Sequence, residues 1–237
     1  MDVLPIRQMI AEDSGCCSYL LGSGRDLILV DPLSDVERFM KTVEVDGSKI
    51  IGVIDTHVHA DHLSGTRNIQ NLTACPIYMH ESSPIRFTFT PLKEEEYHIA
   101  GLKIRVLHTP GHAPEHVCLL VDDKAILTGD TLLVNDVGRV DLGRGDPNQL
   151  YESLFGKLLK LQDHVEVFPG HVGKAHFVSG DTSSTIGVER STNPALQAKT
   201  REDFIQYMTE GWPPKPTHYE QYIKANCGLI DERETRF

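Results

Sequence analysis

The chain has 237 residues, of which 40% are hydrophobic and 24% charged, so it is long and apolar enough to bury a core without disulfides. Its net charge of −11 argues against nucleic acid or an anionic membrane surface as a partner, and no apolar run is long enough to span a membrane. The five cysteines are odd in number and form no CxxC pair, which predicts reduced thiols in a cytoplasmic protein.

The first part of the chain predicts short strands and helices in alternation. A hairpin is expected over 17–32, because the apolar runs CSYLL and LILV flank the turn GSGRD. Apolar residues at helical spacing predict a helix over 34–45. The apolar run KIIGVIDTH, over 49–57, predicts a strand that ends in a histidine cluster. A second helix is expected to begin within 65–72, and another strand within 75–81.

The middle of the chain is rich in predicted strands. They are expected within 97–112 and 116–132, where DDK is the tight turn of a hairpin. One more strand is expected within 165–171, and it also ends in a histidine.

Two later stretches predict helices. Residues 147–162 are amphipathic, with one side formed by Leu150, Leu154, Leu158 and Leu161, and residues 192–211 are also helical in pattern. Strand-rich and helical stretches therefore alternate in two halves, which predicts the α/β class with four layers and two sheets packed face to face. We expect a single domain over 1–237, with a helical C-terminal segment from about residue 190.

Polar motifs recur at the C-terminal ends of four predicted strands: VIDTHVHADH, VLHTPGH, ILTGD and VFPGH. Strand ends in an α/β fold are where loops meet to form sites. Each histidine alone could be a surface residue, and Asp130 alone could cap a turn, but four such strand ends together indicate a metal site. The candidate ligands are His57, His59, Asp61, His62, His112, Asp130 and His171.

The order of these motifs resembles the metallo-β-lactamase superfamily over nearly the whole chain: HVHADH, then HTPGH, TGD and PGH. The resemblance implies a four-layer αββα sandwich with the metal at one edge of its two sheets. Within the superfamily, the stretches HADHLSG, GDTLL, GRVDL and TNPAL resemble the persulfide dioxygenases, which are relatives of glyoxalase II.

The resemblance allows two assignments of the ligands. In the dioxygenase branch, one Fe(II) per chain binds His57, His112 and Asp130, which form a two-histidine, one-carboxylate triad with open positions. The remaining residues, His59, Asp61, His62 and His171, then orient these ligands by hydrogen bonds. In the hydrolase branch, one or two Zn(II) ions are bound. When two are bound, Asp130 bridges them. There His57, His59 and His112 hold one ion, and Asp61, His62 and His171 hold the other.

The stretch GRVDLGRGDP after GDTLL favours the dioxygenase. The expected reaction is iron-dependent oxidation of a low-molecular-weight thiol persulfide by dioxygen to sulfite and thiol. The first alternative is a zinc-dependent thioester hydrolase of the glyoxalase II (hydroxyacylglutathione hydrolase) type. A non-catalytic metal- or sulfur-binding module is the third. The partners are a small-molecule persulfide and dioxygen, with no nucleic acid and no membrane, and the resemblance favours a homodimer.

Three positions bear on the substrate. Arg139 matches the arginine beside the substrate channel of the persulfide dioxygenases, with an ion pair to Asp141 as the structural alternative. Glutathione-using members have a tyrosine where this chain has Gly173, and an arginine where it has Ala195. We therefore expect another carrier, such as coenzyme A or a small bacterial thiol, to serve as well as glutathione or better.

Three residues before the histidine cluster are expected to be structural. Asp31, which ends the run LILVD, is predicted to tie the ligand loop through hydrogen bonds. Cys16 and Cys17 are predicted to be small buried hydrophobes, with a thiol that handles sulfane sulfur as the alternative.

Overall fold

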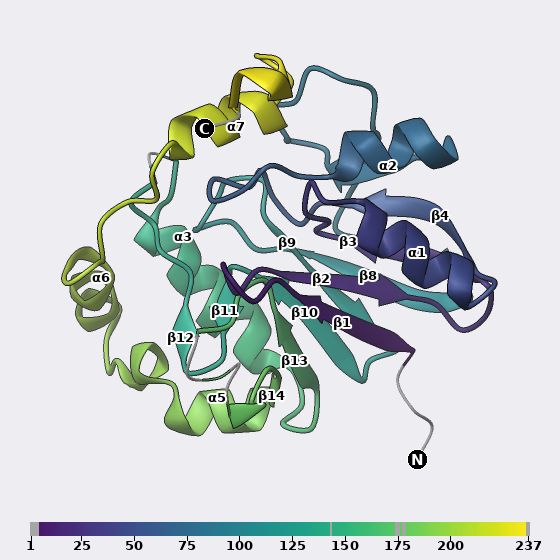
Figure 1. Cartoon of the computed structure of the whole chain (residues 1–237). Helices are drawn as coiled ribbons and strands as arrows, with labels where there is room; N and C mark the ends of the chain where they lie inside the picture. Colours follow the sequence, from purple (N-terminus) through teal and green to yellow (C-terminus); the bar gives the residue numbers. More distant parts are fainter. Residues whose placement is uncertain (1–4, 143, 174–175, 177–178, 236–237) are drawn as a thin grey trace.

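A computed structural model describes residues 5–142, 144–173, 176 and 179–235 of the chain. Two six-stranded sheets pack face to face, and helices cover both outer faces (Figure 1). Helices α1, α2 and α7 cover the first sheet, and α3, α5 and α6 cover the second. The predicted four-layer αββα sandwich is therefore confirmed.

The first sheet has the strand order β1-β2-β3-β4-β5-β6. Its strands are β1 (Ile6–Ile10), β2 (Cys17–Leu21), β3 (Asp26–Val30), β4 (Lys49–Ile54), β5 (Ile77–His80) and β6 (Thr90–Leu92). The predicted hairpin is β2 and β3, which pair antiparallel. Its outer helices are α1 (Glu37–Val45), α2 (Thr66–Thr73) and α7 (Tyr219–Asn226). Strand β1 was not predicted, and α7 was expected only as part of the helical C-terminal segment from about residue 190.

The second sheet has the order β14-β13-β10-β9-β8-β7. Its strands are β7 (Glu96–Ile99), β8 (Leu102–His108), β9 (Val117–Val121), β10 (Ala125–Gly129), β13 (Glu166–Pro169) and β14 (Ser184–Thr185). A two-stranded sheet of β11 (Leu132–Leu133) and β12 (Asp136–Val137) follows β10. The outer helices are α3 (Pro147–Tyr151), α5 (Ile186–Thr192) and α6 (Arg201–Thr209), with the short helices η1 (Glu152–Lys157), η2 (Leu158–Lys160) and η3 (Pro194–Gln197). The last short helix, η4 (Glu232–Thr235), contacts α7 on the side of the first sheet.

The core lies in three layers, one between the sheets and one under each set of helices. Alternate side chains of β2, β3 and β8 to β10 meet between the sheets, where strand periodicity places them. The opposite side chains of β9, β10 and β13 pack against α3, α5 and α6. Because these outer faces are also apolar, β9 and β10 are buried along their whole length and appear in the sequence as continuous apolar runs.

The amphipathic stretch 147–162 is less regular than predicted. One α turn, α3, passes into a π-helical turn, η1, and then into the 3₁₀ turn η2. Leu150, Leu154 and Leu158 are nevertheless fully buried, and Leu161 is partly buried against the same cluster. The apolar face was therefore predicted correctly, whereas the uninterrupted helix was wrong.

Replacing Leu154 by alanine is expected to lower the free energy of unfolding by about 2–5 kcal/mol, because a fully buried leucine leaves a cavity. Urea denaturation measures this change. Leu72→Ala on α2 is the matched control, since Leu72 is 62% exposed and the same substitution there should change stability by about 0.5 kcal/mol or less. Equal losses in the two variants would contradict the packing described for α3 and η1.

Among the described residues, no helix is both long enough and apolar enough to cross a membrane.

Candidate metal centre

The four polar motifs meet at one edge of the two sheets. His57 follows β4, His112 follows β8, Asp130 follows β10 directly and His171 follows β13. Strands β8, β10 and β13 point the same way, because β9 is antiparallel to both neighbours and β10 is parallel to β13. A hydrogen bond from Val117 N to Thr56 O, of 2.9 Å, joins the β4 loop to the second sheet.

His57, His112 and Asp130 form one compact group of donors. One ligand atom of each lies within 4.8 Å of the others. His112 Nε2 is 3.7 Å from Asp130 Oδ2, and the rings of His57 and His112 are 4.9 Å apart. Nε2 of His57 is buried and has no hydrogen-bond partner among the described residues, which is costly unless a ligand binds it. The geometry therefore fits a metal held by two imidazoles and a carboxylate.

Hydrogen bonds orient each of these donors. Thr56 donates its hydroxyl to Asp31, at 2.8 Å, so its oxygen accepts from His57 Nδ1, at 3.0 Å. His112 Nδ1 donates to the carbonyl of Arg139 at 2.7 Å, because a carbonyl can only accept. Both rings therefore carry their proton on Nδ1 and present the lone pair of Nε2, as metal ligands usually do.

Asp31 supports this arrangement through several contacts. Its carboxylate also accepts from the backbone N–H of Thr56, at 2.7 Å, and lies 3.2 Å from His59 Nε2. The residue has φ of 48°, a conformation that aspartate tolerates better than most residues. These contacts match the structural role that the sequence analysis expected for Asp31.

His59 lies in a different environment from the other predicted ligands. Its Nε2 faces Asp31 and, at 4.0 Å, Asp55, and these three residues form a separate group of potential donors. Its Nδ1 is buried and finds no hydrogen-bond partner in the part of the chain that the structure describes, and its ring lies 4.3 Å from that of His57. Both predicted roles, ligand and orienting residue, remain predictions for His59.

Asp61, His62 and His171 lie beside the first group. His171 joins the two carboxylates, with Nδ1 2.8 Å from Asp130 Oδ1 and Nε2 2.9 Å from Asp61 Oδ2. His62 Nδ1 is 2.8 Å from the same Asp61 oxygen. The structure therefore brings these predicted residues together beside Asp130.

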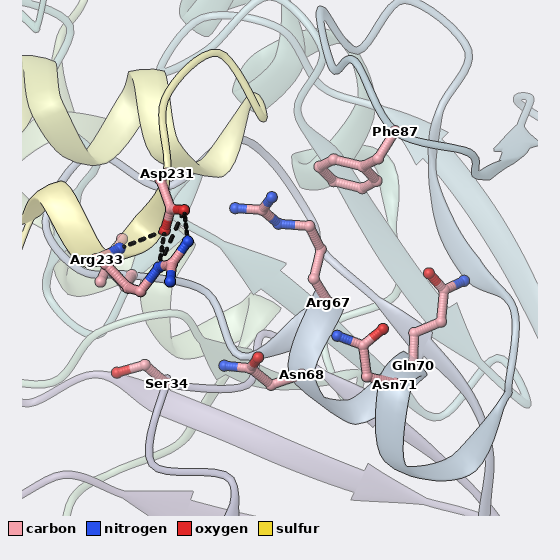
Figure 2. A pocket seen from close by; sticks show the side chains of 9 residues that line it. Ser34, Arg67, Asn68, Gln70, Asn71, Phe87, Asp231 and Arg233 are labelled. Carbon is pink, nitrogen blue, oxygen red and sulfur yellow. Dashed lines mark hydrogen bonds and ion pairs between the residues drawn. The ribbon is translucent and has the colours of Figure 1, made fainter.

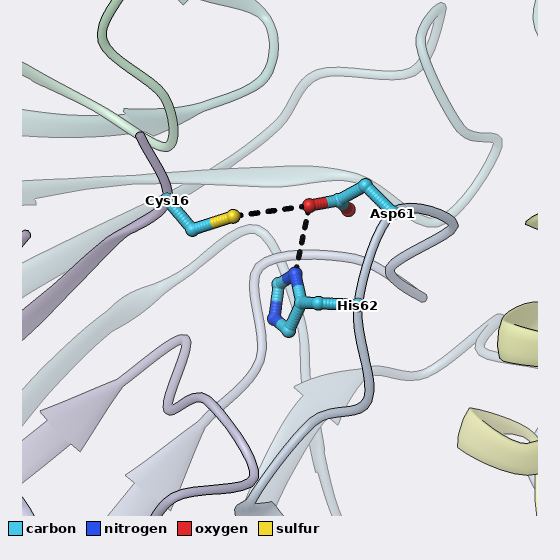
Figure 3. A group of neighbouring side chains, drawn as sticks. All are labelled: Cys16, Asp61 and His62. Carbon is cyan, nitrogen blue, oxygen red and sulfur yellow. Dashed lines mark hydrogen bonds and ion pairs between the residues drawn. The ribbon is translucent and has the colours of Figure 1, made fainter. Parts of the chain in front are cut away.

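A fourth residue joins this second group: Cys16 (Figure 3). It is buried, as predicted, but its Sγ lies 3.2 Å from both Asp61 Oδ2 and His171 Nε2. The interpretation of Cys16 as a plain small hydrophobe is therefore wrong. No local pattern marks this residue, because the contact joins segments 155 positions apart in the chain. Cys17, by contrast, contacts Gln8 and Gly15.

The charges of the first group suit metal binding. Burial lowers the pKa of His57 well below its ordinary value, with the nearby His59 and His112 acting in the same direction. Burial alone would raise the pKa of Asp130, but the positive charge of His171 outweighs it and the pKa lies below the usual range. A neutral imidazole and an ionised carboxylate are the forms that coordinate a metal.

Burial also lowers the pKa of His116 to about 3, so this histidine is neutral. Its Nε2 accepts from the backbone N–H of Asp130 at 3.0 Å, and its ring stacks on His57 at 4.9 Å. His116 is not one of the predicted ligands. Its contacts indicate that it supports the loop that carries Asp130.

Arg139 lies at the edge of a cavity of about 230 Å³ that Asp61, His112, Asp130 and His171 also line. Its guanidinium makes a two-point contact with Asp141, at 2.7 and 2.9 Å, and donates to the carbonyl of Pro213 at 2.9 Å. The structure therefore contains the ion pair that was the structural alternative. Its role toward substrate stays a prediction.

The two positions compared for the thiol carrier differ in exposure. Gly173 is exposed, two residues after His171. Ala195 belongs to η3 and is fully buried in the core. In this chain, therefore, the position after the NP pair is closed to a carrier, whereas the position of Gly173 is open.

A larger cavity, of about 790 Å³, lies between α2 and the C-terminal turn η4 (Figure 2). Arg67 sits over the ring of Phe87 at 5.4 Å, and Arg233 contacts Asp231. None of the predicted metal ligands lines this cavity. Although this cavity is the larger of the two, we therefore do not assign the reaction to it.

Replacing Asp31 by alanine is expected to weaken metal binding by roughly 10–100-fold, because Thr56 and His57 lose the group that orients them. Competition with a chelator of known affinity measures this change. Asp26→Ala is the matched control, since Asp26 is exposed at the start of β3 and forms an ion pair with the exposed Lys49. An unchanged affinity in Asp31→Ala would show that the hydrogen bonds do not set the ligand geometry.

Comparison with known proteins agrees with this geometry. The model of the metallo-β-lactamase superfamily matches residues 12–171. The mitochondrial persulfide dioxygenase ETHE1 of Mus musculus is 30% identical over 231 residues, which cover 94% of this chain and 89% of the relative.

Solved structures give the same result. ETHE1 from Myxococcus xanthus is 32% identical, with a TM-score of 0.87 and coverage of 94% of this chain and 98% of that one. A metallo-β-lactamase from Staphylococcus aureus subsp. aureus COL is 26% identical, with a TM-score of 0.85 and coverage of 94% and 72%. The resemblance seen in the four motifs is thus confirmed, and this chain belongs to the metallo-β-lactamase superfamily.

Proposed function

We propose that the chain oxidises a low-molecular-weight persulfide with dioxygen, at one Fe(II) held by His57, His112 and Asp130. The observation that carries the proposal is this two-histidine, one-carboxylate group, in a chain about 30% identical to persulfide dioxygenases over nearly its whole length. Such a triad leaves coordination positions open for a substrate and dioxygen. Persulfide, dioxygen and water would give thiol, sulfite and two protons.

When bound, Fe(II) would supply the redox chemistry that lets dioxygen react with the sulfane sulfur. The residues of the chain fix the geometry around it. Thr56 and the Arg139 carbonyl hold the imidazoles of His57 and His112 in the correct tautomer. His171 holds one oxygen of Asp130, so the other faces His112.

The cavity beside these residues limits what can enter. Its volume of about 230 Å³ is below the ~300–1,000 Å³ of sites that enclose a drug-sized ligand. It therefore suits the persulfide end of the substrate, with most of the carrier outside. Trp212 and Pro213 line it together with Arg139, which puts one cation and an aromatic ring near the carrier.

The test is dioxygen consumption by the Fe(II)-loaded chain. Adding a persulfide of glutathione or coenzyme A should start dioxygen uptake, and sulfite should appear. The same chain loaded with Zn(II) is the control and should be inactive, because zinc has no redox chemistry. Absence of persulfide-dependent uptake with iron fully bound would refute the proposal.

A zinc-dependent thioester hydrolase remains the second candidate, because one observation favours it. Asp61, His62 and His171 form a second set of donors beside Asp130, and His59 Nδ1 has no hydrogen-bond partner. Two ions in these sets could make hydroxide near neutral pH and polarise a carbonyl. Rapid cleavage of lactoylglutathione that requires two zinc ions per chain would support this candidate.

We propose that the protein works in a reducing compartment of the cell. All five cysteines are free and buried, a pattern that fits the cytoplasm. The homodimer expected from the resemblance also stays a proposal, and gel filtration with light scattering would test it.

A further inference from the structure

Four side chains with metal-binding atoms converge next to the first group: Cys16, Asp61, His62 and His171 (Figure 3 shows the first three). The thiol of Cys16 is 3.2 Å from the Asp61 carboxylate and 3.2 Å from His171 Nε2. Both imidazoles lie within 2.9 Å of the same Asp61 oxygen. One thiol and two imidazoles thus converge on a single carboxylate oxygen, Asp61 Oδ2.

The backbone fixes the thiol in this place. Cys16 and His171 form an isolated antiparallel bridge, Cys17 N donates to Gly170 O at 2.8 Å, and Val172 N donates to Gly15 O at 2.9 Å. Gly15 allows this approach, because its φ is 78° and a Cβ there would lie 2.2 Å from the Val172 carbonyl oxygen. The pairing places the sulfur and the imidazole nitrogen side by side.

We propose that Cys16 is a thiolate ligand of a second metal ion, held together with Asp61, His62 and His171. The sulfur adds a donor to the three nitrogen and oxygen ligands that the superfamily resemblance implied for this position. The inference does not rest on the proposed function, because it concerns a separate ion and holds for either candidate reaction.

The separations fit a four-coordinate zinc site after a small expansion. Tetrahedral Zn²⁺, with bonds of about 2.0–2.3 Å, keeps its donor atoms about 3.4–3.6 Å apart. The closest donor pairs here are 2.8 to 3.2 Å apart, since hydrogen bonds join them. These hydrogen-bonded pairs would have to separate by about half an ångström to admit the ion.

The donor chemistry selects the kind of ion. A thiolate is a soft ligand, which favours zinc or another thiophilic cation over a second iron bound by nitrogen and oxygen. Thiolate and carboxylate together carry two negative charges, which a divalent cation neutralises. The first group offers no sulfur, so the two sites would differ in the metals that they prefer.

The burial of Cys16 argues for a ligand rather than a reactive thiol. Its side chain is 3% exposed, and it does not belong to the lining of the cavity that Asp61 and His171 share with the first group. A metal ion can reach it through those two residues, whereas a bulky persulfide would have to displace them. Accepting sulfane sulfur is therefore the outcome that the geometry disfavours.

The test is a Co(II) titration of the metal-free full-length chain, followed by absorption spectroscopy. Wild-type protein should bind two Co(II) and show a near-ultraviolet sulfur-to-cobalt charge-transfer band. Cys16→Ser should lose that band but keep the visible ligand-field bands from the first group. Cys17→Ser is the matched control and should keep both, because Cys17 contacts Gln8 and Gly15 instead.

Two results would overturn the inference: no charge-transfer band in wild-type protein saturated with Co(II), or the same band in Cys16→Ser. Should Cys16→Ser fail to fold, X-ray absorption of the zinc-loaded wild type decides, since a sulfur scatterer at about 2.3 Å is expected. Nitrogen and oxygen scatterers alone would refute it. An extra sulfur atom on Cys16 after persulfide treatment of the zinc-loaded chain would instead identify a sulfur acceptor.

Discussion

Replacing His57, His112 or Asp130 by alanine is expected to abolish iron binding and persulfide oxidation together. Each change removes one of three donors and leaves a site with two protein ligands. We expect about one iron per wild-type chain and none above background in these variants, measured by elemental analysis after loading and desalting. Circular dichroism should show an unchanged fold, since the three side chains lie at a sheet edge outside the clusters of the core.

The matched controls are His62→Ala and His171→Ala. Both should retain iron, and activity should fall by roughly 10–100-fold, because orienting contacts of this kind tune a metal site without holding it. His171→Ala should be the more damaging, since His171 contacts Asp130 directly at 2.8 Å. Loss of all iron in His62→Ala, or a need for two zinc ions in turnover, would contradict the single-iron assignment.

The second large effect is expected at Arg139. Replacing it by alanine should reduce kcat/KM for persulfides whose carrier has a carboxylate, phosphate or sulfonate. The expected reduction is roughly 10–100-fold, because a hydrogen bond to a charged group contributes about 1.5–3 kcal/mol. Inorganic polysulfide, which has no carrier, should be oxidised at an unchanged rate. Glutathione, coenzyme A and cysteine persulfides complete the comparison.

This comparison also separates the two roles of Arg139. If the contacts of Arg139 with Asp141 and Pro213 only hold the loop, the substitution should lower kcat/KM equally for all substrates, polysulfide included. We expect coenzyme A or a small thiol to match or exceed glutathione, because Gly173 offers no phenol to the carrier and Ala195 is buried. A clear preference for glutathione persulfide that Arg139→Ala leaves intact would show that the carrier binds elsewhere.

Much of the fold and most of the candidate site could be predicted from the sequence, because the signals are local. The run KIIGVI is apolar on both faces of β4 and ends three residues before His57, so strand and donor were predicted together. The same holds for β10 and Asp130, and for β13 and His171. Because parallel strands in one sheet have their C-terminal ends at the same edge, motifs that are far apart in the chain could be predicted to form one site.

The features that could not be predicted depend on contacts between distant segments. Strand β1 alternates weakly and forms because it pairs with β2. Helix α7 contributes Asn226, whose side-chain amide donates to the carbonyls of His59 and His62, at 2.9 Å each. Cys16 reaches the candidate site only because segment 15–17 pairs with segment 170–172. None of these contacts leaves a pattern in the neighbouring sequence.

The most direct measurement of the central claim is the stoichiometry of dioxygen and sulfite in the iron-loaded chain, with the same sample divided between air and nitrogen. In air, one dioxygen should be consumed for each persulfide added and each sulfite formed. Under nitrogen, neither persulfide nor lactoylglutathione should react appreciably. Rapid cleavage of lactoylglutathione under nitrogen, with no persulfide-dependent consumption of dioxygen in air, would contradict the account and assign the chain to the hydrolases.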